Sequence, residues 1–142
     1  MYRITRQFHF CYGHRLLNYE GKCRFLHGHN GLVEITLEGE RLDERGMLRD
    51  FGDIKASVQQ WVDENLDHRM LLRRDDPAAQ PLLELDEPLV LLDVNPTAEN
   101  IARIIYEQSL AEDLPVTEVR LWETPKCHAT YCPGAIGRAG GR

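Results

Sequence analysis

The chain of 142 residues carries 17 lysines and arginines against 23 aspartates and glutamates, so its formal net charge is −6 with the six histidines neutral. This length is typical of one domain, and a composition of 42% hydrophobic and 28% charged residues excludes a wholly disordered chain. The acidic balance argues against nucleic acid and anionic membranes as partners. Because no run of about 18 apolar residues and no signal-peptide stretch occur, we expect a cytoplasmic protein. Four irregularly spaced cysteines predict free thiols rather than a disulfide framework.

The first part of the chain shows two alternating patterns. Over residues 2–14 the even positions are mostly aromatic or apolar, and after a polar loop the odd positions 33, 35 and 37 are apolar between polar neighbours. A period of two is typical of a half-buried strand. We therefore expect two strands, the first facing the core with its even residues and the second with its odd residues.

A helix is predicted over residues 52–66, because apolar residues recur there at helical spacing after a short extended piece at 47–51. Asp50 or Asp53 is available as its N-cap. The stretch 73–88 contains three prolines, so we expect an irregular connector whose middle is not a regular helix.

The last part of the chain predicts a short extended run at 89–92, a helix that Thr97 caps and that ends before Pro115, and strands over 116–124 and 129–131. The order strand, strand, helix, helix, strand, strand predicts a single α+β domain over residues 1–132. Both helices should cover one face of an antiparallel sheet. The glycine-rich end, residues 133–142, is expected to be a flexible tail.

Three histidines stand on the predicted core faces of the first two strands. His14 ends the even face of the first strand, while His27 and His29 lie on the odd face of the second when it is extended backwards. A single core histidine is as readily a hydrogen-bonded residue as a ligand, but three on converging faces favour a metal site. Neutral imidazole is a usual zinc ligand, and three protein ligands leave an open position for catalysis.

Cys23 precedes His27 by four residues and has two possible roles. Its thiolate would complete a closed structural zinc site of one cysteine and three histidines, or it would stand beside an open site as a reactive group. Sequence spacing leaves both alternatives open.

Five segments, in this order, carry a family resemblance: Phe10–His14, Cys23–His29, Leu66–Leu71, Pro96–Asn100 and Trp122–Thr124. They resemble the motifs F-x-A-A-H, C-x-x-x-H-G-H, L-D-H-x-x-L, P-T-x-E-N and K-E-T of the 6-pyruvoyl-tetrahydropterin synthase family. The compact spacing from the cysteine to the histidines is similar to the bacterial 6-carboxytetrahydropterin synthases of the queuosine pathway.

This resemblance implies the tunnelling fold, in which β-β-α-α-β-β subunits form trimeric barrels that stack into a homohexamer with active sites at subunit interfaces. It also implies a lyase acting on a small molecule, 7,8-dihydroneopterin triphosphate, which loses triphosphate and acetaldehyde to give 6-carboxy-5,6,7,8-tetrahydropterin.

The resemblance further implies roles for individual residues. His14, His27 and His29 would hold Zn²⁺, and Cys23 would be the proton-abstracting base. Asp67 and His68 would form a proton relay on the opposite side of the substrate. Glu123 would anchor the pterin, since a carboxylate accepts two parallel hydrogen bonds from an amino-pyrimidinone edge. Thr97 and Glu99 are candidate substrate-binding residues, although helix capping is the simpler interpretation of both.

The chain departs from the family motifs in three places. Tyr12 and Gly13 replace two alanines before His14, Trp122 replaces a lysine beside Glu123, and Leu72 stands where bacterial members often have asparagine. A pyruvoyl-forming enzyme or a related pterin side-chain lyase therefore stays an alternative. The alternative from another class is a non-catalytic, zinc-stabilised module that binds a pterin or a partner and in which Cys23 closes the metal site.

Overall fold

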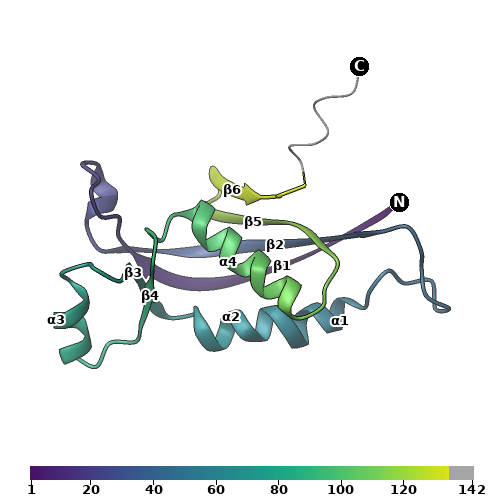
Figure 1. Ribbon diagram of the computed structural model, residues 1–142, viewed down its shortest axis with the longest axis horizontal. Coiled ribbons are helices and arrows are strands. Elements are labelled where there is room, and N and C mark those ends of the chain that lie inside the picture. The colour runs from purple at the N-terminus through teal and green to yellow at the C-terminus, as the bar shows by residue number, and fades with distance from the viewer. Residues whose placement is uncertain (135–142) are drawn as a thin grey trace, which may run out of the picture.

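The computed structural model describes residues 1–134, and positions 135–142 of the predicted tail lie outside the described residues. Figure 1 shows a long, curled sheet with helices along it. Its strands are β1 Tyr2–His14, β2 His27–Gly39, β3 Arg69–Arg73, β4 Leu89–Leu92, β5 Val116–Thr124 and β6 Cys127–Tyr131. The helices are α1 Phe51–Ile54, α2 Gln60–Asn65, α3 Ala79–Glu84 and α4 Ala98–Ala111, with a 3₁₀ turn η1 at Lys22–Arg24 and a π-turn η2 at Lys55–Gln59.

The β1–β2 hairpin is the longest part of the sheet. Its antiparallel register runs without interruption from Tyr2 opposite Gly39 to His14 opposite His27. As predicted, even residues of β1 such as Phe8 and Phe10, and odd residues of β2 such as Ile35, are buried. The other face carries cross-strand polar pairs and is largely exposed.

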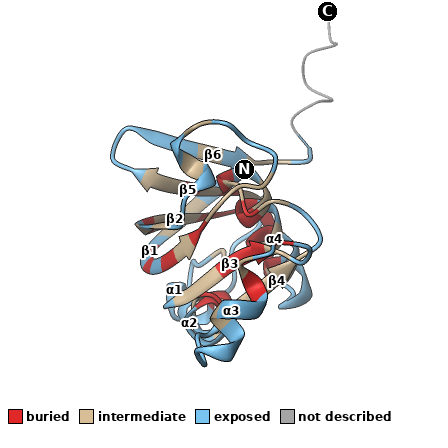
Figure 2. Ribbon diagram, turned by 90° about the vertical axis from the view of Figure 1, so that its left-hand side faces the viewer, coloured by how far each residue is buried: buried red, intermediate tan, exposed pale blue. Residues whose placement is uncertain are grey.

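The strand order is β4-β3-β1-β2-β5-β6. One hydrophobic cluster joins a single face of this sheet to the α1–η2–α2 run and to α4, which confirms the α+β class with these helices on one face. Figure 2 shows the buried residues gathered between the sheet and the helices. Within residues 1–134, no helix is long and apolar enough to cross a membrane.

The sheet is mixed, so the expectation of a purely antiparallel sheet is wrong. β3 runs parallel to β1, with Tyr12 opposite Arg69, and β4 runs parallel to β3. Strand β3 was not predicted from the sequence. This segment directly follows the Asp67–His68 turn and its buried residues, Leu71 and Leu72, are adjacent, so it shows no alternation.

Helix and strand limits also differ from the predictions. The connector 73–88 contains helix α3. Pro81 is compatible with this helix because it lies in the first turn, where a backbone N–H has no intrahelical acceptor to lose. The predicted helix 52–66 starts one residue earlier and includes the π-turn η2, with Asp50 as N-cap accepting from Gly52. The piece at 47–51 is not a strand, and β6 starts at Cys127 rather than 129.

Candidate metal centre and active site

Three imidazoles meet at one end of the β1–β2 hairpin. His14 pairs with His27 in the strand register, and His29 is opposite Tyr12. One ring nitrogen of each histidine lies within 4.8 Å of the others, which is the spacing expected of ligands around one ion. The predicted convergence is therefore observed, and it follows from the period-two alternation of the two strands.

Backbone carbonyls orient two of these rings. Nδ1 of His14 lies 2.6 Å from the carbonyl oxygen of Pro96, and Nδ1 of His27 lies 2.7 Å from that of Phe25. A carbonyl only accepts, so both Nδ1 atoms carry the proton and both Nε2 atoms keep a free lone pair. This arrangement is usual for metal-binding histidines, whose second nitrogen donates to a carbonyl or carboxylate.

The Nε2 atoms of His14, His27 and His29 are all buried and have no hydrogen-bond partner among residues 1–134. Buried polar atoms without partners are costly, so three together indicate a ligand that takes their lone pairs. Burial, reinforced by the neighbouring imidazoles and opposed by the bond to Pro96, lowers the pKa of His14 to about 4. The ring is thus neutral at physiological pH, as a metal ligand must be. The residues fit a zinc ion in a site with three protein ligands.

Glu123 brings a carboxylate to the same place. Its Oε1 lies 3.9 Å from Nε2 of His14, and its Oε2 lies 4.0 Å from Nε2 of His29. The side chain is 26% exposed, so it reaches both the histidines and the open cavity. This position, at the end of β5, explains why one carboxylate interrupts an otherwise apolar row.

Tyr12 also belongs to this cluster. Its ring centroid lies 5.2 Å from that of His14 and 5.7 Å from that of His29, and the ring stacks on Phe10. The hydroxyl is buried and has no hydrogen-bond partner in the part of the chain that the structure describes. Burial and the nearby charge of Glu123 both raise the pKa of this phenol. The ring of Tyr12, one of the departures from the family motifs, thus packs against two of the three histidines.

The side chain of Trp122, the second departure, points away from the cluster of His14, His27 and His29. Its Nε1 donates to Oε2 of Glu34 at 3.0 Å, and its ring packs on His128. Glu34 belongs to the largely polar face of the sheet, whereas Glu123 faces the histidines. Leu72, the third departure, is fully buried in the core.

Cys23 lines a cavity of about 320 Å³ together with His14 and Glu123. The thiol is partly exposed and free. Within the described chain, the group of mutually close ligand atoms comprises the three histidines and does not include Cys23. The thiol thus shares a cavity with one of the three histidines, His14, while His27 and His29 line a separate hollow.

Thr97 and Glu99 line the same cavity at the start of α4. The hydroxyl of Thr97 accepts from the backbone N–H of Asn100 at 3.2 Å, so its capping role is observed. The side-chain amide of Asn100 donates to the carbonyl of Asn95. The Pro96–Asn100 motif therefore holds the segment whose Pro96 carbonyl orients His14, a function that sequence analysis did not identify.

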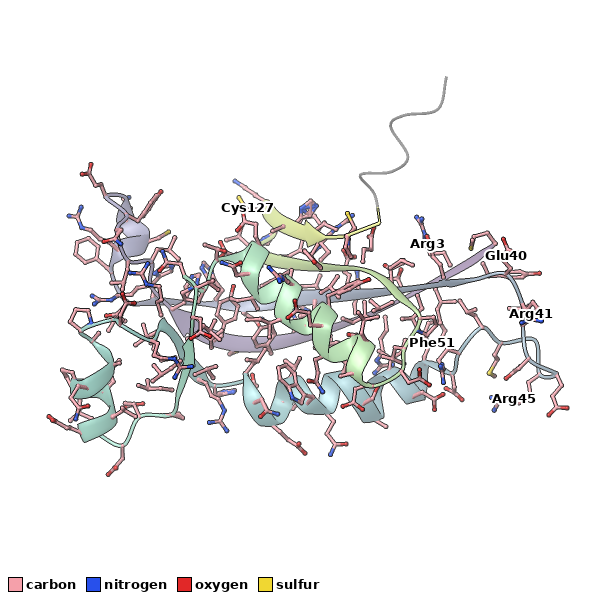
Figure 3. The ribbon with its side chains drawn as sticks, in the orientation of Figure 1. Arg3, Glu40, Arg41, Arg45, Phe51 and Cys127 are labelled. Carbon is pink, nitrogen blue, oxygen red and sulfur yellow. The ribbon has the colours of Figure 1, made fainter. Side chains whose placement is uncertain are left out.

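The remaining wall of this cavity comes from the start of β6. Figure 3 shows Cys127 there, near the N-terminal end of α4 and far from the charged residues Arg3, Arg41 and Arg45 at the other end of the molecule.

Asp67 and His68 form a hydrogen-bonded pair that does not line the cavity of Cys23 and Glu123. Oδ2 of Asp67 lies 2.7 Å from Nδ1 of His68, whose side chain is 78% exposed. Two bonds fix this turn to β1: the N–H of Cys11 donates to Asp67, and the N–H of His68 donates to the carbonyl of Cys11. His68 lines a hollow that does not include Cys23 or Glu123. That hollow includes Tyr12, His27 and His29, whereas His14 lines the cavity of Cys23.

Residues 3–133 match the family model described as 6-pyruvoyl tetrahydropterin synthase. The chain is 37% identical over 134 residues to the 6-carboxy-5,6,7,8-tetrahydropterin synthase of Rickettsia conorii, covering 89% of this chain and 97% of that protein. It is 30% identical to the enzyme of the same name from Haemophilus influenzae, over 92% of this chain and 99% of the relative.

Solved structures of similar fold lead to the same family. An uncharacterised protein from Wolinella succinogenes superposes with a TM-score of 0.76 at 30% identity, covering 92% of this chain and 97% of that one. The 6-pyruvoyl tetrahydropterin synthase of Caenorhabditis elegans gives 0.71 at 25% identity, over 92% and 94% of the two chains. With its motifs, fold and histidine cluster in agreement, the chain belongs to the 6-pyruvoyl tetrahydropterin synthase family.

Proposed function

We propose that this protein is a zinc-dependent 6-carboxytetrahydropterin synthase. It converts 7,8-dihydroneopterin triphosphate to 6-carboxy-5,6,7,8-tetrahydropterin with loss of triphosphate and acetaldehyde, and it acts in the cytoplasm, in the pathway to 7-deazapurines such as queuosine. The observation that carries the proposal is the convergence of three buried, unpartnered imidazole nitrogens beside a carboxylate and a thiol. The names of the bacterial relatives support the choice of product.

His14, His27 and His29 would hold the zinc ion. When bound, such an ion polarises substrate oxygens and stabilises negative charge that develops on them. The protein supplies the geometry, because the carbonyls of Pro96 and Phe25 set the tautomers of two ligands before the metal arrives.

Cys23 is the proposed base. The thiolate is the reactive form of a cysteine. Cys23 shares its cavity with Glu123, so a pterin whose amino-pyrimidinone edge is held by the carboxylate has its side chain within the same enclosure. Thr97 and Glu99 line the wall of this enclosure and would contact the substrate.

Asp67 and His68 are the proposed relay. Asp67 holds the proton of His68 on Nδ1 and leaves Nε2 free at the exposed end of the ring. Because His68 and Cys23 line different hollows of one chain, the proposal includes a homo-oligomer, a hexamer made of two trimers, in which neighbouring chains complete each site. Closing a barrel through neighbouring chains also removes exposed sheet edges.

A non-catalytic zinc module is the competing function. It needs Cys23 as fourth ligand, and the absence of its sulfur from the histidine group in the described chain weighs against it. The alternative of a pyruvoyl product keeps the same metal site and differs in the fate of the side chain.

The proposed activity is tested by measuring acetaldehyde release from 7,8-dihydroneopterin triphosphate, first with zinc-loaded protein and then after treatment with a chelator. We expect release that stops on chelation and returns with added zinc. Zinc-loaded protein that releases no acetaldehyde would contradict the proposed reaction, and a pyruvoyl product would assign the alternative one.

A further inference from the structure

The hydroxyl oxygen of Tyr12 is a buried polar atom that has no role in the proposed function. The residue is 3% exposed, and its hydroxyl has no hydrogen-bond partner within the described chain. The three histidine nitrogens beside it are also unpartnered, but a metal would take their lone pairs. The phenol is different because it is protonated at neutral pH and acts as a donor. Its partner must therefore carry an acceptor.

The ring cannot turn away from this position. It stacks on Phe10 with centroids 5.0 Å apart, and its edge meets the imidazole of His14 at an interplanar angle of 81°. On the other strand Gly31 leaves the space that the ring occupies, since a Cβ there would lie 3.0 Å from Cε1 of Tyr12. Packing on both sides holds the hydroxyl at one place next to the histidine cluster.

The surroundings of Tyr12 restrict what such a partner can be. Glu123 supplies an acceptor to the same cluster but makes no hydrogen bond with the phenol. A pterin with a hydroxylated side chain offers oxygen acceptors, and in the proposed function these oxygens lie at the histidines. A ligand of this class would satisfy Tyr12, whereas a pterin without side-chain oxygen lacks this acceptor.

We infer that Tyr12 is a specificity-determining residue whose hydroxyl donates a hydrogen bond to a side-chain oxygen of the pterin bound at the three histidines. The inference rests on the proposed function, because it needs a pterin at the histidines, where Tyr12 lines a hollow together with His27 and His29. The tyrosine that stands in place of the family's alanine would thus give the protein a preference for pterins with oxygenated side chains.

The test compares two unreactive, fluorescent pterins, neopterin with three side-chain hydroxyls and 6-methylpterin with none. Dissociation constants are measured by fluorescence titration for the zinc-loaded wild type and the Tyr12→Phe variant, with zinc content determined for each. We expect about a three- to tenfold weaker affinity of the variant for neopterin, the usual effect of one lost hydrogen bond, and little change for 6-methylpterin.

A second readout separates binding from a structural role. Removing an unpartnered hydroxyl while keeping the ring should leave the ligand-free melting temperature unchanged or higher. Tyr106→Phe is the matched control, because the hydroxyl of Tyr106 donates to the carbonyl of Val116 away from the histidines. That variant should melt at a lower temperature and bind both pterins like the wild type.

Equal affinities of wild type and Tyr12→Phe for neopterin would overturn the inference, and so would an equal loss for both pterins or a lower melting temperature of the ligand-free variant. A wild type that binds neither pterin would contradict the proposed function itself, and the inference with it.

Discussion

The Nδ1 nitrogen of His14 donates to the carbonyl oxygen of Pro96 across a distance of 2.6 Å, and this bond connects the end of β1 to the segment that precedes α4. The carbonyl is itself fixed by neighbours, since Asn95 exchanges two hydrogen bonds with the backbone of Leu17. The orientation of one proposed ligand is therefore set by residues more than 80 positions away in the chain. A ring held in this way loses little freedom when it binds a metal.

Replacing His14 by alanine should abolish stoichiometric zinc binding, because two imidazoles remain and one carbonyl loses its donor. We expect zinc content, measured by mass spectrometry of the metal, to fall from about one ion per chain to a trace. His9→Ala is the control, since His9 is exposed on β1. Full zinc content in the His14 variant would contradict the proposed ligand set.

Zinc should also stabilise the fold. A ligand that binds only the folded state at a thousand times its dissociation constant adds about 4 kcal/mol to the free energy of unfolding. We therefore expect a clearly lower melting temperature after chelation, restored by zinc and not by magnesium, which prefers oxygen ligands. Identical melting curves with and without zinc would show that the histidine cluster binds no zinc in the folded protein.

Replacing Cys23 by alanine distinguishes an open site from a closed one. Because Cys23 is not among the mutually close ligand atoms, the variant should keep its zinc and its melting temperature while it loses activity by several orders of magnitude. Cys127→Ala, which alters a second thiol of the same cavity, is the control and should stay active. Loss of zinc on replacement of Cys23 would favour the closed, non-catalytic site.

Subunit exchange tests whether neighbouring chains share a site. The Cys23→Ala and His68→Ala variants should each be inactive and folded, since His68 is largely exposed. Coexpressed, they should form mixed oligomers in which some sites combine an intact Cys23 with an intact His68, so a measurable fraction of activity returns. If light scattering shows monomers, or if no mixture regains activity, the shared site is refuted.

The stability of the metal-free protein should fall in weak acid. Burial lowers the pKa of His14 from its usual 6.5 to about 4. Below pH 6.5 the unfolded chain binds a proton that the folded chain rejects, so this contribution is complete above pH 6.5 and is lost progressively toward pH 4. It amounts to about 3 kcal/mol. Urea titrations at several pH values should show a shallower acid loss for His14→Gln, whereas parallel curves would contradict the low pKa.

The ion pair between Arg15 and Asp76 should hold the connector before α3 to the end of β1. Nε of Arg15 lies 2.7 Å from Oδ2 of Asp76, whose side chain is fully buried. Asp76→Asn should cost about 3 kcal/mol in urea unfolding, because it leaves a partly buried guanidinium without its charge partner. The exposed neighbour gives the control, and Asp75→Asn should unfold like the wild type. Equal midpoints for the two variants would exclude this role.

The long hairpin and its histidines could be predicted because alternation over 13 residues fixes both the strand and its inward face. The convergence of His14 and His27 then needs only an antiparallel register. Parallel pairing of β3 with β1 could not be foreseen, since it is decided by a turn in which His68 has a positive φ of 57° and Asp67 binds the backbone of Cys11. Such long-range contacts leave no periodic signal.

The contacts that orient the site residues also could not be predicted from the sequence. The bond from His14 to Pro96 joins residues that are distant in the chain, and a backbone acceptor has no residue-type signature. The sequence predicted Thr97 as a helix cap, which the structure confirms, but the role of Asn100 in holding the segment of that carbonyl follows only from the structure. The sequence shows Tyr12 in place of an alanine of the motif, but that its hydroxyl lacks a partner within the described residues follows only from three-dimensional packing.

The most direct measurement is product analysis by mass spectrometry after incubation of zinc-loaded protein with 7,8-dihydroneopterin triphosphate, beside zinc-loaded Cys23→Ala. We expect 6-carboxy-5,6,7,8-tetrahydropterin from the wild type and unchanged substrate from the variant. Unchanged substrate in both samples, with zinc bound, would contradict the proposed enzyme and leave a zinc-stabilised binding protein.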